Sequence, residues 1–142
     1  MISLYVASSW RNPWYGEAVR ALRAYGFMVY DWRATGGTFT GREPSQVWPQ
    51  DLLSDLASTA KFEMDMAAMQ EAAACVLVEP AGRSAHLEAG WFVGQGRPLY
   101  VWLPEPIEPE LMLLTASLIT PNLADIITRL RWERETRDWG KA

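Results

Sequence analysis

Short apolar segments alternate along the chain with longer segments in which apolar residues recur every three or four positions. The short segments are rich in β-forming residues and predict strands at 2–7, 27–30, 75–79, 99–103 and 118–119. The longer segments predict helices at 13–25, 50–56, 59–74, 84–94 and 122–130. Because the two types alternate, the strands are expected to be parallel and joined by right-handed crossovers. The pattern predicts an α/β fold: a doubly wound, mainly parallel sheet of about four or five strands, flavodoxin- or Rossmann-like, with helices on both faces.

The chain of 142 residues is interpreted as a single domain, 1–142, in which 131–142 form a charged C-terminal tail. A Trp-, Gly- and Thr-containing segment, 32–50, interrupts the alternation of strands and helices. A loop of that length in a small domain is usually functional or disordered.

Composition narrows the class of partner. A formal net charge of -4 and a pI near 5 argue against a nucleic acid polymer, because such partners require a basic surface. The sequence has no apolar run long enough for a membrane span, and its single cysteine, Cys75, cannot form an internal disulfide, so we expect a cytoplasmic protein without a membrane partner. The eight Trp residues have two interpretations. In the first, some are buried in the core and others form an oligomer interface. In the second, they stack against a flat heterocycle.

The most informative segment is 82–91, Gly-Arg-Ser-Ala-His-Leu-Glu-Ala-Gly-Trp. It follows a predicted strand and opens a helix, so the unpaired N–H groups of the helix N-terminus form a site for an anion. Glu88 is expected in the first helical turn, where it either stabilises the helix dipole or acts on a phosphorylated or sugar-bearing ligand. His86, the only histidine, faces away from Glu88 and is expected to be structural or to contact the ligand. With one His and one Cys, no metal site is expected.

The turn after the first predicted strand reaches the same edge of the sheet. Its residues 8–11, Ser-Ser-Trp-Arg, offer hydroxyl groups and a guanidinium that suit a phosphate or a ribose. Asn12 either joins them or caps the following helix, with Pro13 at the first helical position.

Two further residues are candidates for chemistry. Asp65 shares the apolar stripe of the 59–74 helix with Phe62 and Met69, and is either a site residue or an exposed edge residue, because a carboxylate aimed at a core needs a partner or a pocket. Tyr5 lies inside the first predicted strand, where a buried phenol needs a hydrogen-bond partner. A carboxylate from a neighbouring strand–helix turn is the expected partner.

Four segments together resemble the nucleoside 2-deoxyribosyltransferase superfamily, which includes the deoxynucleoside monophosphate N-glycosidases. They are Leu-Tyr-Val-Ala-Ser-Ser-Trp-Arg at 4–11, Phe-Glu-Met-Asp-Met at 62–66, Val-Leu-Val at 76–78 and Gly-Arg-Ser-Ala-His-Leu-Glu-Ala-Gly at 82–90. The resemblance covers approximately 2–103.

The resemblance implies an enzyme that cleaves or transfers the N-glycosidic bond of a nucleoside or nucleotide, a small-molecule substrate, without a cofactor. Glu88 would attack the anomeric carbon as the nucleophile, Asp65 would assist departure of the base as proton donor, and Tyr5 would orient Glu88. The residues expected to bind the substrate are Ser8, Ser9, Trp10, Arg11, Asn12, Trp32, Gly82, Arg83, Ser84 and His86. The resemblance also implies a homodimer or higher homo-oligomer, in which a segment near 115–122 completes a neighbour's site.

Two positions depart from the pattern of that superfamily. Ala89 replaces the usual Leu after the nucleophile, and Gly82 stands where many transferases carry an acid. The missing acid favours a hydrolase over a transferase. Three alternatives stay open: a non-catalytic domain that binds or senses a nucleotide, an NAD-cleaving domain of the TIR-like type, and a structural interaction domain.

Overall fold

A computed structural model describes residues 1–35, 49–108, 110–137 and 139 of the chain. The chain divides into two compact units, of which the first comprises Met1–Tyr30 with Ala72–Ala142 and the second comprises Asp31–Glu71. The predicted loop 32–50 is described only at its two ends, and its middle lies outside the described residues.

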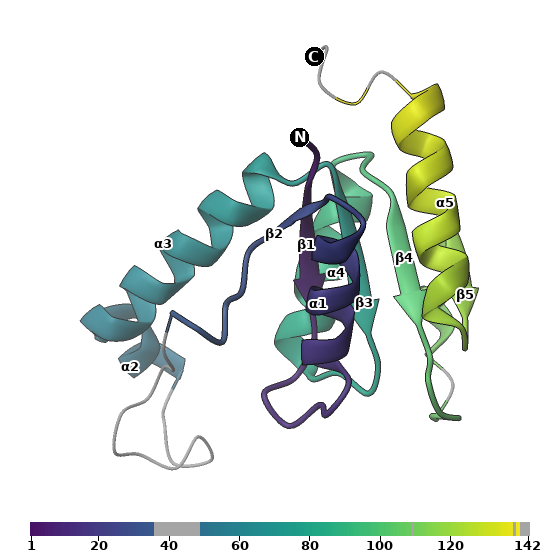
Figure 1. Cartoon of the computed structure of the whole chain (residues 1–142). Coiled ribbons are helices and arrows are strands. Elements are labelled where there is room, and N and C mark those ends of the chain that lie inside the picture. Colours follow the sequence, from purple (N-terminus) through teal and green to yellow (C-terminus); the bar gives the residue numbers. More distant parts are fainter. Residues whose placement is uncertain (36–48, 109, 138, 140–142) are drawn as a thin grey trace. The chain divides into compact units, whose positions relative to one another are not determined.

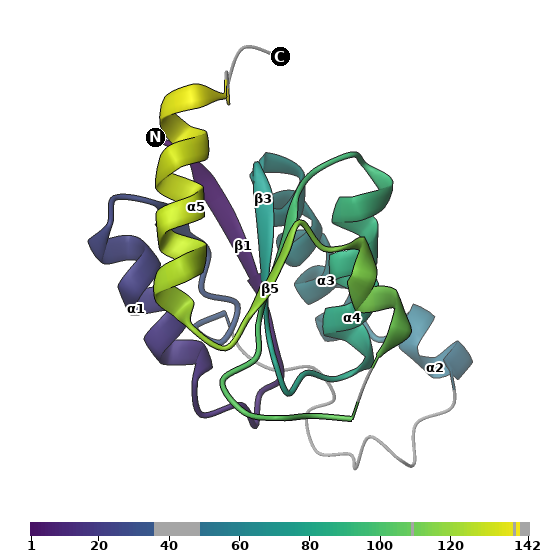
Figure 2. The ribbon, with the colours of Figure 1, turned by 90° about the vertical axis from the view of Figure 1, so that its right-hand side faces the viewer.

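In the described part of the first unit, a five-stranded sheet has the order β2-β1-β3-β4-β5, and every neighbouring pair is parallel (Figure 1). Its strands are β1 (Ser3–Ala7), β2 (Met28–Val29), β3 (Ala74–Val78), β4 (Leu99–Trp102) and β5 (Leu118–Thr120). Helices α1 (Tyr15–Ala24) and α5 (Leu123–Thr136) cover one face of the sheet and α4 (Arg83–Gly94) covers the other, as Figure 2 shows. A short 3-10 helix, η2 (Leu111–Thr115), leads into β5. The predicted doubly wound α/β fold is confirmed.

The two central strands are buried from Leu4 to Ala7 in β1 and from Ala74 to Val78 in β3. A parallel strand with helices on both faces needs apolar residues on both of its sides, which explains these uninterrupted apolar runs. Helix α1 ends before Gly26, whose φ of 85° suits a residue without a Cβ, and the N–H of Phe27 bonds back to the Leu22 carbonyl at 3.2 Å. This closure turns the chain directly into β2.

The second unit contains α2 (Pro49–Ser54) and α3 (Leu56–Glu71). Asp55 separates the two helices and caps α3, because its carboxylate accepts hydrogen bonds from the Ser58 N–H at 3.0 Å and from the Ser58 hydroxyl. The helices predicted at 50–56 and 59–74 are confirmed, and the second one begins three residues earlier than expected.

The predicted cap of the first helix is wrong. Helix α1 begins at Tyr15 with Trp14 at the N-cap position, so Asn12 and Pro13 precede the helix. The side chain of Asn12 accepts a hydrogen bond from the Trp14 N–H, which forms a turn before the helix, and its amide nitrogen is engaged elsewhere.

Two other boundaries differ from expectation. Helix α4 begins at Arg83 and has no acid in its first turn, so Glu88 lies in the second turn and not, as expected, in the first. Because the effect of the helix dipole is confined to the first turn, stabilisation of the helix is not the main reason for a carboxylate at this position. Helix α5 continues to Thr136, into the segment expected to be a charged tail, because Glu133 is fully buried and holds the helix against the sheet.

Candidate active site

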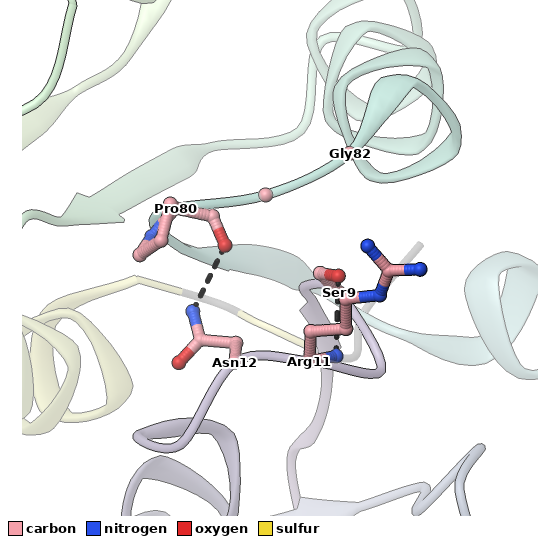
Figure 3. Close-up of a pocket in the computed structure, with 6 residues that line it drawn as sticks. Ser9, Arg11, Asn12, Pro80 and Gly82 are labelled. Carbon is pink, nitrogen blue, oxygen red and sulfur yellow. Dashed lines mark hydrogen bonds between the residues drawn. The ribbon is translucent and has the colours of Figure 1, made fainter.

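A cavity of about 240 Å³ lies at the carboxyl edge of the sheet, between the turn after β1 and the turn after β3. These strands are neighbours, but the chain leaves β1 towards β2 and leaves β3 towards β4, so the two turns diverge from each other. Open α/β sheets bind ligands at such a point. Six residues line the cavity, namely Ser9, Arg11, Asn12, Pro80, Ala81 and Gly82 (Figure 3).

Asn12 fastens the two turns together. Its side chain is 2% exposed, and its amide nitrogen donates to the carbonyls of Val78 at 3.0 Å and Pro80 at 3.1 Å, the second of which Figure 3 shows. The Ser8 hydroxyl adds a bond to the Val78 carbonyl at 2.9 Å. Since both amide hydrogens of Asn12 bind backbone carbonyls, this side chain contributes to the site by fixing its walls.

Arg11 and Gly82 form the open part of the cavity. Arg11 is exposed, its N–H donates to the Ser9 hydroxyl oxygen at 3.3 Å, and in Figure 3 its guanidinium extends towards the turn that carries Gly82. A Cβ added at Gly82 would meet no atom within 4 Å, so this position faces open space. Trp10, next to both Ser9 and Arg11 in sequence, is 53% exposed.

The N-terminus of α4 follows Gly82 directly. The first backbone hydrogen bond of the helix runs from the His86 N–H to the Gly82 carbonyl at 3.3 Å, so the N–H groups of residues 83–85 have no acceptor within the helix. Arg83 and Ser84 are both exposed. A guanidinium on one turn and free helix N–H groups on the other make this edge of the sheet suited to an anion.

Tyr5 and Glu88 lie on the same side of the sheet. Tyr5 is 1% exposed and stacks on Phe92 of α4, with ring centroids 6.0 Å apart. Across the β1–β3 pair it is in register with Cys75. Burial raises the pKa of the Cys75 thiol, and the nearby Glu88 carboxylate raises it further. The half-buried Glu88 therefore approaches the sheet beneath α4, on the face that carries Tyr5.

Asp65 lies in the second unit, on α3, and it is paired with a lysine. Lys61 Nζ is 2.5 Å from Asp65 Oδ1 and 2.7 Å from the Thr35 hydroxyl oxygen, and both Lys61 and Asp65 are largely buried. The expected apolar stripe is only partly present, because Phe62 is 64% exposed while Met69 is buried. Through Lys61, Asp65 has the hydrogen-bond partner that a largely buried carboxylate needs.

Trp32 also belongs to the second unit, where it is 6% exposed and the Arg33 guanidinium carbon lies 5.6 Å from its ring centroid. Such packing is typical of a cation–π contact.

Sequence reasoning missed Glu79, which is 2% exposed and lies between β3 and the cavity. Its carboxylate accepts hydrogen bonds from the Ala81 N–H and is paired with His86, which the sequence analysis expected to be structural or a ligand contact. The available signal was a carboxylate at the end of an otherwise apolar buried strand, which needs a partner.

Among the described residues, no three His, Cys, Asp or Glu side chains gather closely enough to hold a metal ion. In the same part of the chain, no helix combines the length and apolar character needed to cross a membrane.

No family model and no curated protein matches the chain. Among solved structures it is similar to a 2-deoxyribosyltransferase from Bacillus psychrosaccharolyticus, at 17% identity and a TM-score of 0.66, over 88% of this chain and 90% of that chain. A conserved protein from Enterococcus faecalis V583 matches at 10% identity and a TM-score of 0.65, over 94% and 99% of the two chains. The CMP N-glycosidase BcmB from Clostridium botulinum matches at 13% identity and a TM-score of 0.53, over 91% and 98%. At these identities the comparisons establish a shared fold, which agrees with the α/β fold that the alternation of strands and helices predicts.

Proposed function

We propose that this protein is an enzyme that cleaves the N-glycosidic bond of a nucleoside 5′-monophosphate, by hydrolysis rather than by transfer to a second base. The supporting observation is the cavity at the carboxyl edge of the sheet, where Arg11 faces the N-terminus of α4, the helix that carries Glu88. Two of the solved structures with this fold are named as a 2-deoxyribosyltransferase and a CMP N-glycosidase, which agrees with the proposed reaction class.

The cavity fits the sugar-phosphate half of such a substrate. Its volume of about 240 Å³ is below the range of about 300–1,000 Å³ that whole drug-sized ligands occupy. Arg11 would pair with the phosphate, and the free N–H groups of residues 83–85 would bind its oxygens along the helix axis. The exposed ring of Trp10 would stack on the base.

In the proposed reaction, a Glu88 carboxylate oxygen bonds to the anomeric carbon as the bond from that carbon to the base nitrogen breaks. The base leaves with the bonding electron pair and takes up a proton from solvent. Water then attacks the anomeric carbon, displaces the Glu88 carboxylate and gives one proton back to solvent, which leaves the free sugar phosphate. Tyr5 would orient the carboxylate from the sheet beneath α4. Asp65 is the candidate proton donor that the resemblance and the apolar stripe suggest, and in the structure it is paired with Lys61.

Gly82 supports hydrolysis over transfer. The superfamily that the sequence resembles often has an acid at this position, whereas here the position faces open space. Position 82 therefore offers no carboxylate to hold a second base, and the open space there would give water access to the glycosyl-enzyme.

The test is chromatography of the free base released from a panel of nucleosides and their 5′-monophosphates, with and without a second free base as acceptor. We expect release from a monophosphate, little from its nucleoside, and no exchange product. The Glu88→Gln variant is expected to lose activity by about a thousandfold or more, as removal of a nucleophile does. Glu135→Gln, which removes an exposed carboxylate near the end of α5, is the matched control. Activity that survives in Glu88→Gln would exclude this mechanism.

We also propose that the chain forms a homo-oligomer through η2. Leu111, Met112 and Leu114 are each more than 70% exposed, and Ile119 on the edge strand β5 is 37% exposed. Monomeric proteins seldom expose apolar side chains in such a cluster. Sizing by light scattering is expected to show a dimer or larger assembly that Leu114→Glu dissociates.

A further inference from the structure

The turn between β3 and α4 is held from inside by a buried acid and the only histidine of the chain. Glu79, which is 2% exposed, accepts a hydrogen bond at Oε2 from the Ala81 N–H at 2.7 Å. Its Oε1 lies 2.7 Å from His86 Nε2, and His86 Nδ1 lies 2.8 Å from the Gly82 carbonyl oxygen. The two side chains thus bind the backbone at two of the three turn residues that line the cavity.

The partners of His86 determine where its protons lie. A carbonyl oxygen can only accept, so Nδ1 must donate to Gly82. One hydrogen lies between His86 Nε2 and Glu79 Oε1 and joins the two side chains. All contacts are therefore satisfied when Nδ1 donates to the Gly82 carbonyl, one hydrogen joins Nε2 to Glu79 Oε1, and Glu79 Oε2 accepts from the Ala81 N–H.

We propose that Glu79 and His86 form a positioning pair that holds the 80–82 turn in the conformation that binds the phosphate-bearing half of the substrate. The polar contacts of the pair with the cavity walls are those with Ala81 and Gly82. The pair would therefore affect substrate binding through these two residues and through the helix N-terminus that follows them. This inference rests on the proposed function, because it assigns the cavity to a sugar phosphate. Loss of the pair is expected to weaken ground-state binding more than it slows the chemical step.

Two substitutions of Glu79 separate charge from geometry. In Glu79→Gln the side-chain oxygen can still accept from Ala81 and the amide N–H can donate to a neutral His86, whose Nδ1 still donates to Gly82. In Glu79→Leu, the Ala81 N–H and His86 Nε2 lose their acceptor. His86→Leu, at a side chain that is 32% exposed, removes the pair from the other end and perturbs the core less.

The probe is ribose 5-phosphate, titrated into the full chain by calorimetry and by amide NMR. We expect Glu79→Gln to bind within about twofold of the unmodified protein, and Glu79→Leu and His86→Leu to bind about tenfold more weakly, the cost of a buried unpaired donor. Where the base-release assay identifies a substrate, KM should rise in His86→Leu more than kcat falls. Because the chain has one histidine, its ring nitrogens can be observed without overlap: Nδ1 should carry a proton both in the unmodified protein and in Glu79→Gln.

The outcomes are distinguishable. Ribose 5-phosphate binding that is unchanged in His86→Leu, or a ring whose Nδ1 carries no proton in the unmodified protein, would overturn the positioning role even if base release is observed. Binding that depends on the pair without base release from any nucleotide would overturn the proposed reaction and leave the positioning role intact.

Discussion

Asn12, which lines the cavity, also joins the two turns that form its walls. Its side chain donates to the carbonyls of Val78, the last residue of β3, and of Pro80, accepts from the Trp14 N–H, and is almost completely buried. The two turns that line the cavity are therefore joined through one amide group. A carboxylate of the same size could not replace it, because it would face two carbonyl oxygens with no hydrogen to donate.

We expect Asn12→Ala to lower the free energy of unfolding by about 1–3 kcal/mol, the cost of buried partners left unpaired, and Asn12→Asp to lower it further. Urea unfolding followed by circular dichroism measures both. The matched control is Asn122→Ala, because Asn122 is exposed at the N-cap of α5 and its side chain makes no capping bond. Equal effects at the two asparagines would show that Asn12 does not join the turns.

Gly82 is the residue that most directly tests the identity of the ligand. Its φ of -82° suits any residue, and a Cβ there meets no atom, so a side chain would fold without strain and enter open space beside Arg11. We expect Gly82→Asp to keep its thermal stability and to bind ribose 5-phosphate about tenfold or more weakly, because a carboxylate close to the phosphate repels it.

Gly94→Asp provides the charge-matched control for this substitution. Gly94 ends α4, at the opposite end of the helix from the cavity, and a Cβ there also meets no atom. Affinity reduced equally in both variants would show that the protein's overall charge, rather than a phosphate at Gly82, causes the effect.

At the scale of elements, the alternation of apolar runs was sufficient to predict the sheet, because every strand of the described sheet is a short apolar segment. Helix bounds were less accurate where tertiary contacts override local signals. Asn12 followed by Pro13 has the local signature of a helix start, but the bonds of Asn12 to the end of β3 delay the helix until Tyr15. Such a contact joins residues far apart in sequence, and no local pattern contains it.

The same reasoning explains what could be predicted of the site. The sheet topology brings the turns after β1 and β3 together, so Ser9, Arg11 and Gly82 could be predicted as neighbours from the strand order alone. Glu79 could not, because its partner His86 lies one helical turn beyond the cavity, and the pairing depends on the path of the turn between them. Lys61 next to Asp65 was missed because the apolar stripe was given more weight than the charge four residues earlier.

Helix α5 is held on the sheet by a buried charge cluster. Glu133, which is fully buried, accepts hydrogen bonds from the Tyr100 hydroxyl of β4 at 2.6 Å and from Arg129 Nε at 2.7 Å. The hydrogen bond to Glu133 raises the pKa of Arg129, so that guanidinium stays charged. Burial and the adjacent carboxylate raise the pKa of Tyr100, so its hydroxyl keeps the proton that it donates.

We expect Glu133→Leu to destabilise the protein by about 1–3 kcal/mol, because it leaves the buried Tyr100 phenol without its acceptor. The double variant Tyr100→Phe with Glu133→Leu should recover part of that loss, since it also removes the buried donor. A double-mutant cycle measured by urea unfolding gives the coupling between the two residues. Strictly additive effects would mean that the cluster does not fasten α5 to β4.

At the scale of the whole molecule, the pH dependence of stability is linked to a thiol and a phenol that are buried in neighbouring strands of the sheet. Cys75 of β3 and Tyr100 of β4 both have pKa values above their ordinary values of 9.0 and 10.0, each chiefly because of burial. In the unfolded chain both groups return to those ordinary values. The folded form therefore retains two protons that the unfolded form releases in alkaline solution.

The difference in bound protons between the folded and unfolded states determines how the free energy of unfolding changes with pH. Below the ordinary pKa values, both states hold these protons and the two groups contribute no pH dependence. Above them the unfolded state binds fewer protons, so the free energy of unfolding falls as the pH rises, by up to about 1.4 kcal/mol per pH unit for each group. We expect thermal unfolding between pH 8 and pH 11 to show this decline beginning near pH 9, first from Cys75 and then from Tyr100. Cys75→Ala should remove the first part of the slope and Tyr100→Phe the second, and an unchanged profile in both variants would assign the alkaline loss to other groups.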